Sequence, residues 1–476
     1  MGKRGNGETE SENGEVMNEP SALLSTFLRT AHAHPDSFFL DGEQRITYRS
    51  AAERVAEQAQ QLRGAANGSP LAIQGPNTAA WILSFLAARA AGLVVIPVSP
   101  DAPLDQWRAL GELVGPFYLF DAIQRTGELR HADGQRRPFP RSVGFGLLTS
   151  GSTGFPRLVL RSDQSLITEG ERYLHGFGFA PADRIVVALP LCHAFILGLA
   201  LGGAVVSGCT LHLVPRFTPR ATQRVLREGK ASILPLVPAT ARLLCDAFLD
   251  DGPAPRAVRQ IIIGAGPVSP ELEQAVITRL GRVPARNYGS SETGATLGTT
   301  GQTVRDGVTG AALPGVEAVI MGEERPGSLF VRMEAPFLGY LSADTIDASR
   351  VSPDGWYSTG DFAIQDDAGW ISITGRIGEG LRRGGRFIHP AEVEHAMRGH
   401  PDVADVVVIG RRDAHGEDVI EAHIETGTEV FPSLDSLRQH AARVLEPYKI
   451  PTVWRFHARF PRTSGGKPDR ARLSGE

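Results

Sequence analysis

The chain has 476 residues and a formal net charge of −4. This length exceeds what one hydrophobic core supports, so at least two domains are expected. Charges of both signs are spread along the sequence and form no broad basic patch, which argues against a nucleic-acid partner. The three cysteines, Cys192, Cys209 and Cys245, are far apart. They suggest neither a zinc site nor a disulfide framework, and predict a cytoplasmic protein.

Two segments bear on targeting and membrane insertion. Residues 1–20 are polar, acidic and poor in apolar groups, which predicts a disordered tail and not a signal peptide. Residues 185–215 contain no Lys, Arg, Asp or Glu and are long enough to cross a bilayer. However, Pro190, His193 and several glycines divide this segment, so we expect a buried strand, helix and strand and no integral membrane segment.

Short uncharged runs at 71–73, 93–98, 185–188 and 261–264 alternate with helical stretches, a pattern that predicts an α/β fold with strands covered on both faces. Glycines and charged residues become frequent at 375–385. Beyond them, a strand at 403–409 and a helix at 433–444 predict a small α+β domain. We therefore expect a tail at 1–20, a large multi-layer domain at 21–374 and a C-terminal domain at 375–476.

Residues 148–157 (LTSGSTGFPR) place glycines, hydroxyls and a cation on one short loop after an apolar strand. Glycines let backbone N–H groups turn toward a polyanion, and the hydroxyls and Arg157 add donors and charge. A plain surface turn is the alternative, and the P-loop pattern is absent. The predicted phosphate-binding residues are Thr149, Ser150, Gly151, Ser152, Thr153, Gly154 and Arg157.

Four further segments follow in order: 287–294 (NYGSSETG), 357–361 (YSTGD), 375–376 with 384–386 (GR and GGR), and 461–467 (PRTSGGK). With the first loop, they resemble the adenylate-forming (AMP-binding) superfamily of acyl-CoA synthetases, aryl-acid ligases, luciferases and peptide-synthetase adenylation domains. The resemblance extends over about residues 22–473. It implies a large adenylating domain with a mobile C-terminal lid, and ATP, Mg²⁺ and a pantetheine thiol as ligands.

The resemblance also implies individual roles around the nucleotide. Tyr288 would offer a flat face to adenine, unless it is simply a core residue, and Glu292 would bind Mg²⁺, although a lone Glu in such a loop is ordinarily a surface group. The remaining residues of the adenine slot and its flank are Gly264, Ala265, Gly266, Asn287, Gly289 and Ser291.

Asp361 would accept hydrogen bonds from both ribose hydroxyls, since a carboxylate has two oxygens to offer them; a simple turn Asp is the alternative. Arg376 would contact the ribose or α-phosphate, and Arg386 the ATP phosphates. Gly378 stands where the family commonly has the Asp about which the lid rotates. Glycine keeps that hinge rotatable but removes a side chain that could bias it.

Lys467 resembles the lysine that the family swings over the substrate carboxylate and α-phosphate, where a compact cation offsets developing charge. His193 resembles the histidine beside the acyl pocket, though a lone His in an apolar run is often a satisfied core residue.

Residues 190–199 offer no carboxylate to hold an α-amino group, so an amino-acid substrate is disfavoured. An apolar pocket is expected there, which suits a small-molecule aryl or fatty acid. The expected reaction activates this acid as an acyl-adenylate and transfers it to CoA or to the phosphopantetheine of an acyl carrier protein. A degenerate nucleotide- or acyl-binding scaffold and a luciferase-like oxygenase remain alternatives.

Overall fold

A computed structural model of the chain describes residues 21–62, 65, 67–122, 126–130, 139–149, 157–248, 255–299, 307–322, 326–341, 345–376, 381–383, 386–388, 390–412, 418–463 and 467–475. Residues 1–20, 150–156 and 377–380 are among those outside this part. The predicted tail and the predicted hinge at Gly378 are therefore not described.

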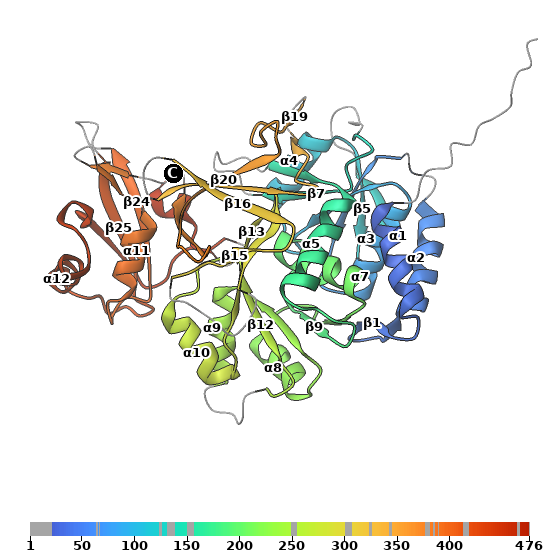
Figure 1. Cartoon of the computed structure of the whole chain (residues 1–476), viewed down its shortest axis with the longest axis horizontal. Helices are drawn as coiled ribbons and strands as arrows, with labels where there is room; N and C mark the ends of the chain where they lie inside the picture. Colours follow the sequence, from blue (N-terminus) through green and yellow to red (C-terminus); the bar gives the residue numbers. More distant parts are fainter. Residues whose placement is uncertain are drawn as a thin grey trace, which may run out of the picture.

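Two large mixed sheets form the body of the molecule (Figure 1). The nine-stranded sheet has the order β15-β14-β13-β12-β11-β9-β10-β1-β2, and the eight-stranded sheet has the order β19-β18-β8-β7-β4-β3-β5-β6. The central strands of both sheets pair in parallel, and the edge strands pair antiparallel. The strands of the first sheet are β1 (Phe38–Asp41), β2 (Ile46–Thr47), β9 (Arg184–Val187), β10 (Thr210–Leu213), β11 (Ile233–Leu236), β12 (Gln260–Gly264), β13 (Ala285–Ser290), β14 (Gly294–Gly298) and β15 (Ala311–Ala312). Those of the second are β3 (Pro70–Gln74), β4 (Val94–Val98), β5 (Phe117–Asp121), β6 (Thr126–Arg130), β7 (Phe145–Thr149), β8 (Arg157–Arg161), β18 (Gly339–Leu341) and β19 (Ile346–Asp347).

Helices connect these strands and share one core with both sheets, because Phe145 of β7 and Ile185 of β9 belong to the same buried cluster. Side-chain oxygens of Ser or Thr cap helices α1, α3, α5, α8 and α10 and satisfy backbone N–H groups of the first turn. The helices are α1 (Ala22–Ala33), α2 (Tyr48–Leu62), α3 (Ala79–Ala90), α4 (Leu104–Val114), α5 (Asp163–Gly176), α6 (Ala194–Ile196), the π-helix η1 (Leu197–Gly202), α7 (Gly203–Ser207), α8 (Pro219–Arg227), α9 (Pro238–Ala247) and α10 (Pro270–Leu280). The expected multi-layer α/β fold is confirmed.

The uncharged segment 185–215 is a strand, a helical stretch and a strand, as predicted: β9, then α6 with η1 and α7, then β10. Within the described residues, no helix has both the length and the apolar character needed to cross a membrane. Helix α5 packs against η1 so closely that a Cβ on Gly170 would overlap the carbonyl oxygen of Gly202. Two glycines therefore permit backbone-to-backbone contact at this helix crossing.

A smaller antiparallel sheet follows, in the order β16-β17-β20-β21, with strands β16 (Val316–Met321), β17 (Gly327–Met333), β20 (Trp356–Gln365) and β21 (Ile371–Arg376). The expected domain boundary at 374/375 falls inside β21, which pairs with β20 through Arg376.

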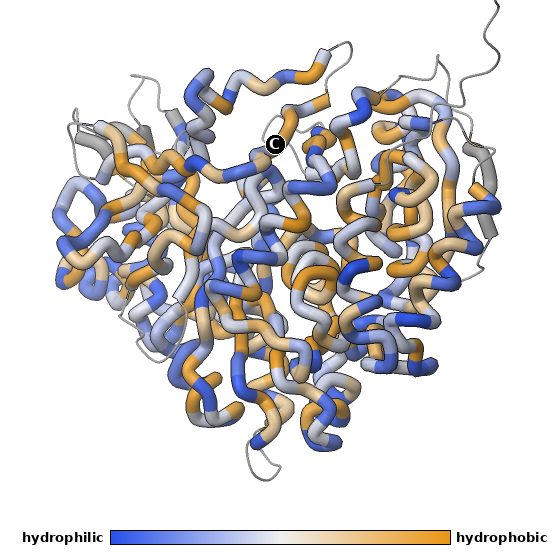
Figure 2. Tube along the Cα trace, turned by 45° about the vertical axis from the view of Figure 1, so that its right-hand side comes forward, coloured by the Kyte–Doolittle hydropathy of each residue, from blue (hydrophilic) through white to orange (hydrophobic). Residues whose placement is uncertain are grey.

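The C-terminal part of the chain lies to one side of the large sheets (Figure 1). It has its own three-stranded sheet and its own buried cluster, which includes Val393, Val406 and Ile424. Figure 2 shows hydrophobic segments mainly in the interior and hydrophilic segments at many outer turns. The elements are β22 (Leu381–Arg383), β23 (Arg386–Ile388), α11 (Pro390–Arg398), β24 (Asp405–Arg412), β25 (Asp418–Glu425), α12 (Leu434–Val444), the 3-10 helix η2 (Pro447–Lys449), β26 (Val453–His457) and α13 (Arg470–Ser474).

The contact between α5 and η1 generates a stability prediction. Gly170→Ala should lower the free energy of unfolding by about 1–3 kcal/mol, because the new methyl group meets a backbone carbonyl that cannot move alone. Gly399→Ala is the control, since the nearest atom to its Cβ would be 3.4 Å away. Denaturant unfolding of both variants measures the effect, and equal midpoints for Gly170→Ala and the native chain would contradict the tight crossing.

Candidate active site

The carboxylate of Asp361 lies where two sheets meet. Asp361 stands inside β20 and is 6% exposed. Its Oδ2 accepts a hydrogen bond of 2.5 Å from the hydroxyl of Tyr288 on β13, and its Oδ1 accepts one of 3.1 Å from Nε of Arg376 on β21. Asp361 and Arg376 are also register partners in the sheet. The alternative that Asp361 is a turn residue is therefore wrong.

Lys467 brings the C-terminal part of the chain to this carboxylate. A hydrogen bond of 2.8 Å from the N–H of Thr463 to the carbonyl of Lys467, with a bridge between Arg462 and Pro468, closes the base of its loop. Loss of hydration and the charge of Arg376 lower the pKa of Lys467, and Asp361 partly offsets them. The side chain retains exposed surface. The ammonium group is thus within electrostatic reach of Asp361 and Arg376.

His193 reaches the same place from the large domain. It is the residue before α6, and its side chain is half-buried. Burial, followed by the charge of Lys467, lowers the pKa of His193 below 6.5. The imidazole is therefore neutral at pH 7. The charge of Lys467 therefore acts on His193.

The residues expected around adenine lie on two adjacent strands. Gly264 at the end of β12 pairs in parallel register with Asn287 of β13, and the buried Asn287 accepts a hydrogen bond of 3.2 Å from Tyr173. Ala265 has a positive φ of 59°, a backbone strain tolerated mainly at functional sites. Tyr288 is half-buried and packs against the main core, so it contributes to the core while its hydroxyl faces Asp361.

Small residues also shape this slot. The ring of Phe195 lies so close to Gly264 that a Cβ there would be 2.9 Å from it, and Gly266 faces Pro238. At Gly289, a Cβ would overlap the carbonyl of Gly294 across the hairpin. Larger side chains are therefore excluded along the ends of β12 and β13.

Glu292 lies with Ser291 in the turn between β13 and β14. Its Oε1 accepts a hydrogen bond of 2.6 Å from the hydroxyl of Tyr340, and the guanidinium carbon of Arg157 lies 5.6 Å from the centre of the Tyr340 ring. Tyr340 was missed by sequence reasoning, because nothing in its local sequence indicates a contact 48 residues away. A half-buried carboxylate held by one neutral phenol fits the oxygen ligand that Mg²⁺ prefers.

Other predicted residues are described only in part. Thr149 and Arg157 are register partners at the ends of β7 and β8, and the Thr149 hydroxyl donates to the Arg157 carbonyl at 3.3 Å. The two strands thus bring both ends of the predicted phosphate loop together. The predictions for Ser150, Gly151, Ser152, Thr153 and Gly154 fall outside the described residues, as do Gly378 and the side chain of Arg386.

A buried charge network supports the Glu292 turn from behind. Glu169 on α5 is 1% exposed and forms an ion pair of 3.0 Å with Arg161. Its Oε1 accepts a hydrogen bond of 3.1 Å from the backbone N–H of Ala295. A Cβ at either Gly198 of η1 or Gly294 would overlap this carboxylate, so Glu169 fills the space between the two segments.

Arg172, one turn further along α5, completes the network. Its Nη1 donates to the carbonyls of Thr293 at 3.0 Å and Ala295 at 2.9 Å, and burial lowers its pKa to about 10. Helix α5 is therefore bonded to the segment that directly follows Glu292. The sequence signal for this network is the pair of opposite charges at Glu169 and Arg172, three residues apart on one helix face.

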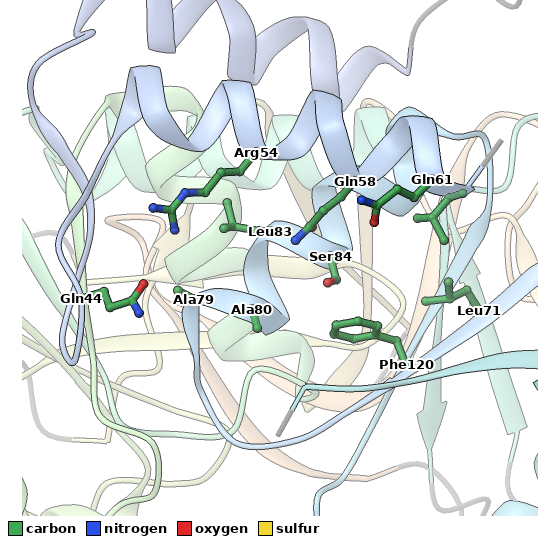
Figure 3. A pocket seen from close by; sticks show the side chains of 11 residues that line it. Gln44, Arg54, Gln58, Gln61, Leu71, Ala79, Ala80, Leu83, Ser84 and Phe120 are labelled. Carbon is green, nitrogen blue, oxygen red and sulfur yellow. The ribbon is translucent and has the colours of Figure 1, made fainter. Parts of the chain in front are cut away.

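A surface cavity of about 210 Å³ lies away from these residues (Figure 3). Arg54, Gln58 and Gln61 of α2 stand above it, and Leu83 and Ser84 of α3 form part of its wall. None of the predicted site residues lines it. The candidate chemistry thus belongs to the Asp361 region and not to this cavity.

Family comparisons agree with the geometry. The model for the AMP-binding enzyme matches residues 27–341, and that for the AMP-binding enzyme C-terminal domain matches residues 392–467. The chain belongs to the AMP-binding enzyme family. This family includes AMP-forming acid–CoA ligases.

A sulfoacetate–CoA ligase of Cupriavidus necator is 29% identical over 347 residues, which are 71% of this chain and 67% of that enzyme. Two further relatives are matched over 62% and 60% of their own length. A Rhodococcus jostii CoA ligase, for a propanoyl group attached to a methyl-dioxo-octahydroindene, is 25% identical over 95% of this chain and 98% of its own. The fold also resembles ATP-bound MatB from Rhodopseudomonas palustris, with a TM-score of 0.83, 21% identity and coverage of 96% and 98%.

The buried network leads to a second prediction. Glu169→Gln keeps an acceptor for Ala295 but leaves the buried Arg161 without its counter-charge, so the free energy of unfolding should fall by about 3–5 kcal/mol. Glu317→Gln removes an exposed ion pair with Arg332 and should leave the unfolding midpoint unchanged. Chemical denaturation compares the two, and similar midpoints would show that Glu169 is dispensable.

Proposed function

We propose that this protein activates a carboxylic acid with ATP and transfers the acyl group to a pantetheine thiol, on CoA or on an acyl carrier protein. The observation that carries the proposal is the convergence of Lys467 with Asp361, Arg376 and His193. The charge of Lys467, from the C-terminal part of the chain, acts at the Asp361–Arg376 pair and at His193, which a degenerate scaffold would not require. The domain arrangement proposed for this activity is 21–374 for the adenylating domain and 375–476 for the lid, with Gly378 as the hinge.

In the first step, a carboxylate oxygen attacks the α-phosphorus of ATP, and pyrophosphate leaves. The acid and the triphosphate are both anionic, so the site must hold like charges together and stabilise the additional charge at the reacting phosphate. Lys467 would supply a compact cation for this purpose. Its ammonium group lies within electrostatic reach of Asp361 and Arg376, the proposed nucleotide-binding residues. In the second step, the thiol attacks the acyl carbon and AMP leaves.

Asp361 would hold the ribose, because its buried carboxylate is already fixed by Tyr288 and Arg376 and can accept from both ribose hydroxyls. Tyr288, Asn287 and the strained Ala265 would form the adenine slot. Arg376 is well placed to reach the ribose or α-phosphate beside them. The structurally similar MatB binds ATP, which supports a nucleotide ligand for this chain.

Glu292 would hold Mg²⁺, which neutralises phosphate charge when bound. Its hydrogen-bond partner is the neutral Tyr340. Among the described residues, no cation lies within salt-bridge distance of this carboxylate. Thr149, Arg157 and the loop between them would contact the β- and γ-phosphates. Ser291 lies in the same turn as Glu292 and would offer a hydroxyl there.

The acid would enter beside the neutral His193 and the ring of Phe195, an apolar setting that suits an aryl or fatty acid. The relatives at 25–29% identity include enzymes for a sulfonate-bearing acid and a bicyclic propanoate. Acid-dependent exchange of labelled pyrophosphate into ATP across aryl, fatty and short polar acids tests the proposal. We expect exchange with at least one apolar acid, followed by thioester formation with CoA or a carrier protein; no exchange with any acid would refute the activity.

The ribose role of Asp361 yields a third prediction. Asp361→Ala should weaken AMP binding by about 10- to 150-fold, because it removes hydrogen bonds to a charged acceptor, which contribute about 1.5–3 kcal/mol to binding. Asp354→Ala is the control, because Asp354 lies in an exposed turn before the same strand. Calorimetric titration with AMP measures both variants, and equal affinities would remove Asp361 from the nucleotide site.

A further inference from the structure

A second arginine, Arg350, lies near the Asp361 and Glu292 region. Arg350 follows β19 and directly precedes the segment leading into β20. Its carbonyl accepts a hydrogen bond of 3.0 Å from the N–H of Ser358, and the next residue, Val351, bridges Tyr357. Its Nη1 lies 3.5 Å from the position that a Cβ on Gly360 would take. The guanidinium therefore lies over the residues just before Asp361.

Aromatic side chains connect Arg350 to Glu292. The residue after Arg350, Val351, bridges Tyr357, whose ring centre is 5.3 Å from that of Phe337. Phe337 is in turn 5.1 Å from Tyr340, the hydrogen-bond donor to Glu292. The charge of Glu292 also acts on Arg350. These contacts place the cation between the candidate ribose carboxylate and the candidate metal carboxylate.

Arg157 is the other arginine near this group. Its guanidinium lies over the Tyr340 ring at 5.6 Å, and the carboxylate of Asp347 is influenced by both Arg157 and Arg350. Within the described part of the chain, no salt bridge of 4.0 Å or less joins either arginine to a carboxylate. Two guanidinium groups that form no such salt bridge thus lie near Tyr340 and Glu292. Such planar donor groups match phosphate oxygens.

We propose that Arg350 binds the β- and γ-phosphates of ATP opposite Arg157, so that the two arginines hold the triphosphate and later the pyrophosphate. This inference rests on the proposed function, because it requires ATP at this site. Arg350 is an exposed residue, so its guanidinium is accessible to an anion. Arg350 is thereby a substrate-binding residue that none of the sequence motifs includes.

Titration with three ligands separates this role from a structural one. Calorimetry would compare Mg-ATP, Mg-pyrophosphate and AMP binding to the native chain, Arg350→Gln and Arg350→Lys. Arg350→Gln should weaken ATP and pyrophosphate binding by about tenfold or more, as expected for a lost charged hydrogen bond, and leave AMP binding unchanged, since AMP has no β- or γ-phosphate. Arg350→Lys should give an intermediate loss, because lysine keeps the charge but not the fork.

Arg332→Gln is the matched control, an exposed arginine on β17 that pairs with Glu317. It should leave all three affinities unchanged, and unfolding midpoints would confirm that each variant is folded. Equal weakening of AMP and pyrophosphate in Arg350→Gln would overturn the inference, as would unchanged affinity for all three ligands. If the native chain binds none of them, the proposed function itself fails, which is a distinct result.

Discussion

The candidate site depends on one buried carboxylate. Asp361 is almost fully enclosed, yet it accepts hydrogen bonds from Tyr288 of the nine-stranded sheet and Arg376 of the four-stranded sheet. A buried charge is costly unless its oxygens are satisfied, so these two donors are what allow an anion at the junction. Lys467 then adds a cation from the C-terminal domain. Together these contacts link three parts of the fold at the proposed reaction centre.

Rigid support for this centre comes from helix α5. Glu169 and Arg172 fix the chain segment directly after Glu292, and Tyr173 on the same helix donates to Asn287 beside the adenine slot. One helix thus bonds both to the candidate metal turn and to the candidate nucleotide strand. Charged groups buried behind a site hold it by directional bonds, whereas an apolar contact would allow more sliding.

Local sequence predicted much of the architecture, because strand runs such as 93–98 and 261–264 and the divided segment 185–215 carry their own periodicity and breakers. The motifs also drew attention to Tyr288, Asp361 and Arg376, which the structure brings together. Sequence reasoning could not place Asp361 within a strand, since Ser-Thr-Gly-Asp equally suits a turn and the deciding partner, Tyr288, is 73 residues away. Tyr340, Glu169 and Arg350 were missed for the same reason: their roles arise from long-range packing that no local pattern encodes. The roles proposed for the phosphate loop and Gly378 stay predictions.

The central claim is that Lys467 serves acid activation specifically, within a site completed by the C-terminal domain. The most direct test measures the two half-reactions of Lys467→Ala separately, with Lys230→Ala as the control because Lys230 pairs with Glu228 at the surface of the large domain. The account predicts that Lys467→Ala loses acyl-adenylate formation but still converts a chemically supplied acyl-adenylate into thioester. Equal loss of both half-reactions, or normal adenylation, would contradict it.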